Sequence, residues 1–206
     1  MHVAIISGSH RPGGETHHIA AWFAAELQKS GHSSYTLNLA EANLPLWDEG
    51  MWGMGETAPM WKEKWGPISA ELQQAEAFII LAPEYAGMVP ATLKNFFLLV
   101  GGKECGHKPA LICAITSSGT NGAYPVSELR ASSYKNCKIA YLPEHLIFRH
   151  AGEILKAEVK PEFQSNDAYM QERARWCLQL LAGYATGLNA VRASGLSHHE
   201  KFPFGM

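Results

Sequence analysis

The sequence predicts an α/β protein in which helices cover both faces of a five-stranded parallel sheet. Short apolar runs alternate five times with longer stretches in which apolar residues recur at helical spacing. Several of the short runs are apolar at every position, as strands buried on both faces are. The 206 residues, 47% of them hydrophobic, are enough for one well-filled core. We therefore expect one domain over residues 1–192, followed by a tail over 193–206.

The strands are expected in the short apolar runs. The third is the clearest, because residues 77–82 read Ala-Phe-Ile-Ile-Leu-Ala. The last contains Pro143, which cannot donate to a ladder of hydrogen bonds and which interrupts the strand. The five expected strands cover residues 3–6, 34–39, 77–82, 110–116 and a part of 139–150.

Helices are expected between these strands. The first begins near Glu15, where apolar residues take up helical spacing, and ends near Gly31. Pro90 is well placed at the first position of another helix. The remaining helices are expected over residues 67–75, 90–100, 124–135 and 167–188.

The loop after the first strand has the composition of a phosphate site. Residues 5–16 pass from an apolar strand through three glycines to a helix, and free backbone N–H groups at a helix start hold anions. Ser9 and Thr16 add hydroxyl groups, and Arg11 adds a charged fork. The alternative is an ordinary tight turn that contains serines.

Three better-known loops do not fit these residues. A Walker A loop needs Lys and Ser or Thr where Gly14 and Glu15 stand. The glycine spacing does not match the dinucleotide fingerprint. A phosphoacceptor domain needs carboxylates where Ser7 and Gly8 stand. A monophosphate held by hydroxyls, amides and one Arg remains.

Two further loops should lie beside this one, because ligands of such sheets bind outside the carboxyl ends of the strands. Residues 83–90 and 117–125 are rich in Gly, Ser, Pro and Tyr. Tyr85 has a flat amphipathic ring and Gly87 allows close backbone approach, which suits a planar heteroaromatic ligand. The alternative is that Tyr85 covers the core at a turn.

Charge and cysteine content exclude several classes of function. The formal net charge is −2, so the chain has no excess of positive charge with which to bind nucleic acid or an acidic membrane surface. The four cysteines form no CxxC pair, so we expect neither a metal site nor a disulfide framework. No apolar run approaches the length of a membrane span, and we expect a cytoplasmic protein.

Three motifs in this order resemble a known family. They are Gly8-Ser-His-Arg11 with Thr16, Pro83-Glu-Tyr-Ala-Gly87 followed by Leu93-Lys-Asn95, and Ser117-Ser-Gly119 followed by Leu129-Arg130. Over residues 2–155 the chain is similar to the NADPH-dependent FMN reductases, which include quinone, azo and chromate reductases. The resemblance implies a flavodoxin-like α/β/α sandwich with strand order 2-1-3-4-5.

The resemblance also implies the cofactors FMN and NADPH or NADH. It places Ser9, Arg11 and Thr16 on the FMN phosphate. The remaining site residues that it implies are Pro83, Glu84, Tyr85, Ala86 and Gly87 around the ribityl chain and ring, with Ser117, Ser118 and Gly119 on the other side. Three positions depart from the pattern: Ala86 replaces Asn, Met88 replaces Ser and Gly14 replaces Ser.

The expected function is hydride transfer from NAD(P)H to FMN and onward to a small acceptor, namely free flavin, a quinone or an azo compound. Because the cofactor carries this chemistry, we assign no catalytic acid, base or nucleophile. Glu84 is more typical of a helix cap or a solvated charge than of a proton donor. The alternatives are an FMN-binding electron carrier, against which the small net charge argues, and a non-catalytic binding protein.

Two segments of the sequence are more apolar than a surface in contact with water requires, so we expect them to pack against a ligand, a loop or another subunit. The segment 46–65 holds four tryptophans and three methionines and is either a lid beside the flavin or a surface that packs in an interface or under a loop. The helix over 90–100 is apolar around most of its circumference. We therefore expect a homodimer or a homotetramer.

Overall fold

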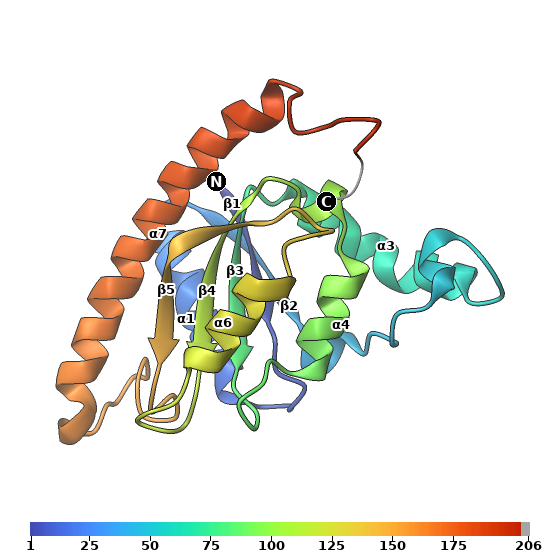
Figure 1. Ribbon diagram of the computed structural model, residues 1–206. Coiled ribbons are helices and arrows are strands. Elements are labelled where there is room, and N and C mark those ends of the chain that lie inside the picture. The colour runs from blue at the N-terminus through green and yellow to red at the C-terminus, as the bar shows by residue number, and fades with distance from the viewer. Residues whose placement is uncertain (203–206) are drawn as a thin grey trace.

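The computed structural model describes residues 1–202. Five parallel strands form a single sheet in the order β2-β1-β3-β4-β5, as expected (Figure 1). The strands are β1 (His2–Ser7), β2 (Ser33–Asn38), β3 (Ala77–Pro83), β4 (Pro109–Ile115) and β5 (Ala140–Phe148).

The central strands are buried on both faces, which explains their unbroken apolar sequence. Every residue of β3 and β4 is buried. Their register pairs Leu81 with both Ser7 of β1 and Cys113 of β4, so β1 ends only two residues before β3 and β4. The loops that leave them therefore emerge together, at the lower edge of the sheet in Figure 1.

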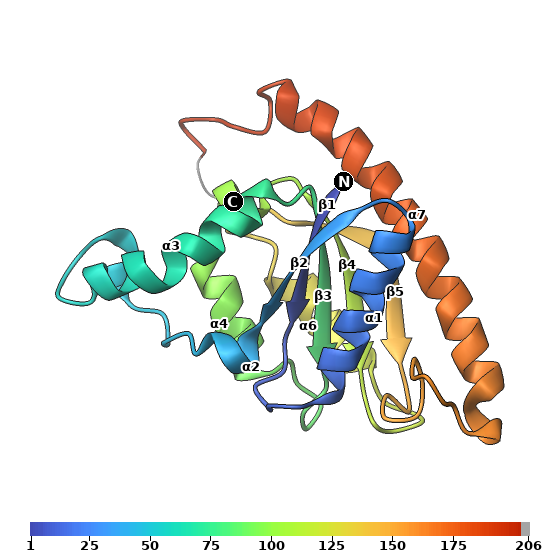
Figure 2. The same cartoon turned by 180° about the vertical axis from the view of Figure 1, so that it is seen from behind.

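Helices cover the two faces and bury two separate apolar clusters. Figure 1 shows α6 in front of the sheet, and Figure 2 shows α1 in front of it from behind. The first cluster lies under α1 (Glu15–Lys29) and α7 (Gln164–Ala193). The second lies under α3 (Ala58–Gln74), α4 (Ala91–Leu99) and α6 (Ala123–Ser132). Short helical turns complete the chain: α2 (Leu39–Ala42), η1 (Glu49–Trp52), α5 (Gly102–Cys105) and η2 (Pro161–Phe163).

Helix α3 begins well before the expected start at Pro67. Trp61 and Trp65, four residues apart on one helix face, are 2% and 6% exposed and hold the first turns against the second cluster. Pro67 lies inside the helix. The preceding residue is Gly66, which has no Cβ to clash with the proline ring. The interpretation of Pro67 as a helix start was therefore wrong, because tertiary packing of the tryptophans extends the helix through it.

Helix α7 extends further than the expected 167–188. It is 30 residues long, and its last turns rise beyond the sheet in Figure 1. Near its end the Arg192 guanidinium donates to the carbonyl of His107 at 2.9 Å. Helix α7 ends at Ala193, the first residue of the expected tail, and residues 203–206 of that tail lie outside the described residues.

The edge strand β5 accommodates Pro143 through a register shift against β4. Arg130 of α6 donates to the carbonyl oxygens of Leu142 and Pro143 at 2.6 and 3.1 Å. The guanidinium thus replaces ladder bonds that the shift removes. This gives the Leu129-Arg130 motif a structural role.

Within residues 1–202, no helix combines the length and apolar character that crossing a membrane requires.

Candidate functional site

The loop between β1 and α1 packs tightly against β3. The Gly8 N–H donates to the Leu81 carbonyl at 3.0 Å. A Cβ on Gly8 would lie 2.5 Å from that carbonyl oxygen, a distance that real side chains do not adopt. Glycine is therefore required here, and its close approach brings the first loop beside the third.

The start of α1 is left open. Its N-cap is Gly14, which provides no side-chain cap, so the first backbone N–H groups lack that partner. Thr16 is 1% exposed and its hydroxyl has no hydrogen-bond partner. Arg11 is exposed and forms no ion pair within residues 1–202. Amides, a hydroxyl and a guanidinium gathered at one helix start can hold an anion.

The third loop is a tight hairpin. Tyr85 and Met88 exchange two backbone hydrogen bonds of 3.1 and 3.0 Å. Ala86 and Gly87 between them have φ angles of 51° and 76°, the left-handed conformation of a type I′ turn. The Tyr85 hydroxyl lies 3.1 Å from Ser9 Oγ, which joins this loop to the first.

Glu84 joins the third loop to the fourth. Its carboxylate accepts a hydrogen bond of 2.6 Å from the N–H of Gly122, the N-cap of α6. A negative charge at a helix start is favourable. This geometry makes Glu84 a helix cap, which is one of the two roles that the sequence favours over proton transfer.

The fourth loop is held by its own hydroxyl groups. Thr116 Oγ1 accepts from the Ser118 N–H at 3.1 Å, and Ser118 Oγ accepts from the Thr120 N–H at 3.1 Å. A Cβ on Gly119 would lie 2.7 Å from Nε2 of His150. The loop is thus folded back on itself, and Ser117 stays exposed at its start.

The three loops meet around a cavity of about 80 Å³. Among the predicted site residues, those that line it are Ser9, Arg11, Thr16, Pro83, Glu84, Tyr85 and Ser117. The other four, Ala86, Gly87, Ser118 and Gly119, lie on the same loops outside this lining. Sequence reasoning missed Thr116, which lines the cavity. Its position as the last residue of the expected fourth strand, at the carboxyl edge of the sheet, is the signal that could have found it. It also missed Ala151, for which the sequence contains no signal.

Glu15 brings a negative charge to the cavity, and two basic side chains lie close to it. Nδ1 of His18 lies 2.9 Å from its carboxylate, and the Lys156 ammonium lies 3.6 Å away. Burial lowers the pKa of His18 and outweighs the hydrogen bond to the Ile154 carbonyl and the charge of Glu15, which raise it. Lys156 thus supplies a permanent positive charge near Glu15.

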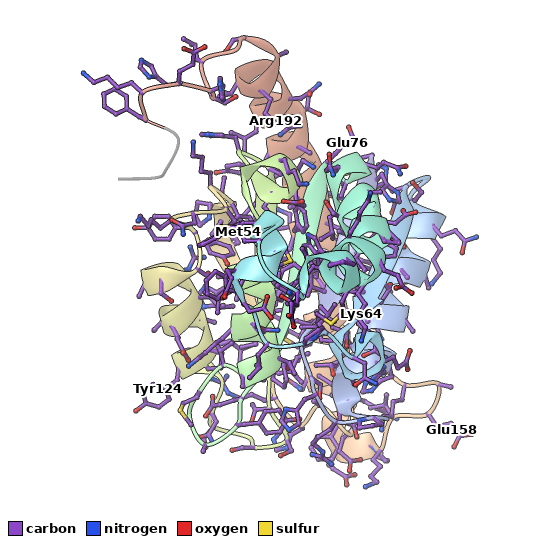
Figure 3. All side chains as sticks on the ribbon, turned by 90° about the vertical axis from the view of Figure 1, so that its right-hand side faces the viewer. Met54, Lys64, Glu76, Tyr124, Glu158 and Arg192 are labelled. Carbon is purple, nitrogen blue, oxygen red and sulfur yellow. The ribbon has the colours of Figure 1, made fainter. Side chains whose placement is uncertain are left out.

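The segment 46–65 projects from the α3 and α4 side of the molecule (Figure 1). Asn95 of the second motif anchors its start, because its side chain accepts from the Trp47 N–H and donates to the Pro45 carbonyl, both at 2.8 Å. In Figure 3, Met54 lies well above Tyr124, which marks the carboxyl edge of the sheet. No residue of the segment lines the cavity between the loops.

Asp48 gives this segment its internal order. Its Oδ1 accepts from Nε1 of Trp61 at 2.7 Å, from Thr57 at 2.9 Å and from the Gly50 N–H at 2.8 Å. Partial burial raises the pKa of Asp48, and these three donors outweigh it and lower the pKa overall. Trp61 is therefore fixed in the core, while Trp52 and Met54 remain 67% and 50% exposed.

Comparison with known proteins identifies the family. The sequence model for NADPH-dependent FMN reductases matches residues 1–153, the part that carries all three loops. The chain belongs to this family. A relative described as an NADPH azoreductase, from Bacillus sp. (strain OY1-2), is 24% identical over 132 residues, which are 64% of this chain and 68% of that protein.

Solved structures show the same flavodoxin-like fold. The flavoenzyme NAD(P)H:(acceptor) oxidoreductase FerB from Paracoccus denitrificans has a TM-score of 0.62 at 16% identity, with 92% of this chain and 97% of that chain covered. An FMN-dependent NADH-azoreductase from Bacillus anthracis in complex with FMN has a TM-score of 0.56 at 15% identity, with 86% and 98% covered. As a member of its family, the protein is an NAD(P)H-dependent oxidoreductase that uses FMN.

Proposed function

We propose that the reductase binds the phosphate of FMN in the cradle formed by Ser9, Arg11 and Thr16. The buried Thr16 hydroxyl carries this proposal, because buried polar groups in proteins nearly always have a partner. A phosphate oxygen would accept from this hydroxyl and from the uncapped N–H groups of α1. Arg11 would add a charge-assisted hydrogen bond.

The third and fourth loops would then hold the rest of the cofactor. Residues 83–87 and 117–119 would contact the ribityl chain and the flavin ring. The exposed side chains of Met88 and Tyr124, 53% and 69% accessible, provide an apolar surface that suits a planar ring. Tyr124 lies at this edge of the molecule in Figure 3.

Bound FMN supplies the redox chemistry, since it accepts a hydride from the nicotinamide and passes electrons onward. The chain binds and orients the cofactor and shields it from water. Glu84 is engaged by the Gly122 N–H, so we assign it to holding the loop and not to proton transfer.

We propose that the acceptor is a small molecule: free flavin, a quinone or an azo compound. The azoreductase relative supports an azo compound. The formal net charge of −2 argues against an acidic docking face for a protein partner.

We further propose that the reductase forms a homodimer or a homotetramer through α4. Leu98 on this helix is 62% exposed. Beside it, a groove of about 380 Å³ with Phe97 and Leu129 in its lining runs between α4 and α6. Light scattering on purified protein tests this proposal, and a monomer at micromolar concentration would contradict it.

An anaerobic absorbance titration tests the function. FMN is added to the protein, unbound flavin is removed, and NADPH or NADH is added separately. We expect a retained flavin band that bleaches within a turnover time, followed by reoxidation by a quinone, an azo dye or excess FMN. Flavin that stays oxidised with both nucleotides, together with no NAD(P)H oxidation in excess FMN, would overturn the proposal.

A further inference from the structure

The loop over residues 84–89 is attached to α6 at both of its ends. At its start, the Glu84 carboxylate accepts from the Gly122 N–H at 2.6 Å. At its end, the Val89 N–H donates to Oε2 of Glu128 at 2.8 Å. One contact reaches the N-cap of the helix and the other reaches its second turn, so both ends of the loop are tied to α6.

The loop needs such attachment because its own conformation is unfavourable. Ala86 has a φ angle of 51°, a region where an L-residue with a Cβ costs about 1–2 kcal/mol. Inside the turn only the two Tyr85–Met88 backbone bonds oppose this cost. The contacts at the two ends must therefore contribute to holding the turn in place.

Glu128 is well suited to hold the second end. Its other carboxylate oxygen lies 2.5 Å from the Lys94 ammonium, and its side chain is 30% exposed. Burial raises the pKa of Glu128, and the Lys94 ion pair and the Val89 N–H outweigh it and lower the pKa overall. The group is thus ionised at neutral pH, and an ionised acceptor makes the stronger hydrogen bond.

Within residues 1–202, the Glu128 carboxylate is the acceptor that the Val89 N–H has. Val89 is 3% exposed, so water does not replace a lost acceptor freely. A buried donor without a partner costs the full desolvation penalty of that group. The loop would then shift to an arrangement in which this amide reaches solvent.

We propose that Glu128 is a positioning residue that holds the cofactor-binding loop through the Val89 amide and thereby sets the affinity for FMN without touching it. This inference rests on the proposed function. Its effect follows from population shift: the apparent Kd rises in proportion as the fraction of protein in the binding-competent loop conformation falls.

The test compares FMN affinity and amide hydrogen exchange in the cofactor-free protein. In Glu128→Ala we expect the Kd for FMN to rise about 10-fold, equivalent to about 1.4 kcal/mol. We also expect faster exchange in peptides that cover residues 84–90, with unchanged exchange in β3. A general loss of structure would accelerate both regions.

Two matched variants separate the hydrogen bond from the ion pair. Glu128→Gln keeps an acceptor for Val89 and loses the charge, so we expect a Kd within about 3-fold of wild type. Lys94→Met leaves the carboxylate and removes an ion pair whose lysine is 50% exposed, a contact of small energetic value. We expect this variant to bind FMN as wild type does. If Glu128→Ala does not fold, Glu128→Asp, which is one methylene shorter, takes its place.

Wild-type affinity and wild-type exchange in Glu128→Ala would overturn the inference. So would a Lys94→Met variant that is impaired as much as Glu128→Ala. A wild-type protein that does not bind FMN would contradict the proposed function instead, and the exchange comparison would still decide whether Glu128 holds the loop.

Discussion

Two buried charged groups at the amino edge of the sheet have hydrogen-bond partners, whereas two buried hydroxyls at its carboxyl edge have none. At the amino edge, Lys108 is 7% exposed and its ammonium donates to the carbonyls of Leu72 and Gln73 at 3.0 and 2.9 Å. Glu104 there is 1% exposed and accepts from Ser69 and Gly101. At the carboxyl edge, the buried hydroxyls of Ser7 and Thr16 have no partner.

This difference separates groups that stabilise the fold from groups that are available to a ligand. A satisfied buried group costs stability when its partner is removed. An unsatisfied one costs stability while it stays unpaired, and binding recovers that cost. Removing the Glu104 carboxylate should therefore lower stability and leave FMN binding unchanged, whereas removing the unpaired Thr16 hydroxyl should weaken FMN binding without lowering stability.

The largest effect is expected at Glu104. Glu104→Ala leaves the Ser69 hydroxyl and the Gly101 N–H without their acceptor, so we expect the free energy of unfolding to fall by about 3 kcal/mol. Urea unfolding measures this change. Lys103→Ala is the control, because this side chain is 68% exposed and its ammonium, 3.5 Å from Glu104, should contribute less than about 1 kcal/mol. Weaker FMN binding with unchanged stability would contradict the comparison.

The next effect depends on pH. Burial lowers the pKa of Lys108 from 10.5 to about 8, so the unfolded chain binds this proton more tightly than the folded one. Below pH 8 both states are protonated and the cost of burial is constant. Between pH 8 and 10.5, wild type should gain stability relative to Lys108→Met by at most about 1.4 kcal/mol per pH unit.

Parallel urea unfolding of both proteins at several pH values in this window measures the gain. A difference between the two proteins that stays constant or shrinks as the pH rises would show that the ammonium is not desolvated.

At the carboxyl edge, Thr16→Val should separate stability from binding. We expect the Kd for FMN to rise about 10-fold, or about 1.4 kcal/mol. We also expect the cofactor-free protein to become about 1 kcal/mol more stable, because an unpaired buried hydroxyl is removed. Thr16→Ser keeps the hydroxyl and serves as the control. A valine variant with lower stability and wild-type affinity would place Thr16 with the structural groups.

The smallest effect concerns Ala86. Asparagine tolerates the left-handed conformation better than alanine, so Ala86→Asn should stabilise the protein by about 0.5 kcal/mol. Ala86→Val should do the opposite, because a β-branched residue is strongly disfavoured there. Thermal unfolding measures the change in stability of each variant. A change of the same sign in both would show that the backbone angle is not the cause.

Whether a feature could be predicted from the sequence depends on how far along the chain its cause acts. The strands and the glycine-containing loop that follows β1 could be predicted because apolar runs, glycines and prolines act on their immediate neighbours. Where distant packing overrides a local signal, the prediction was wrong. Pro67 looks like a helix start, but Trp61 and Trp65 are buried against the sheet and extend α3 to Ala58.

By itself the sequence determined the α/β class, the edge at which the loops gather and the family to which the chain belongs. Only the tertiary structure decided which polar groups find partners. Thr16 is buried without one, Glu84 reaches Gly122, and Val89 donates to Glu128 across 39 residues. The reason is physical: hydrogen bonds between loops depend on how the strands bring distant residues together, and no local pattern encodes that distance.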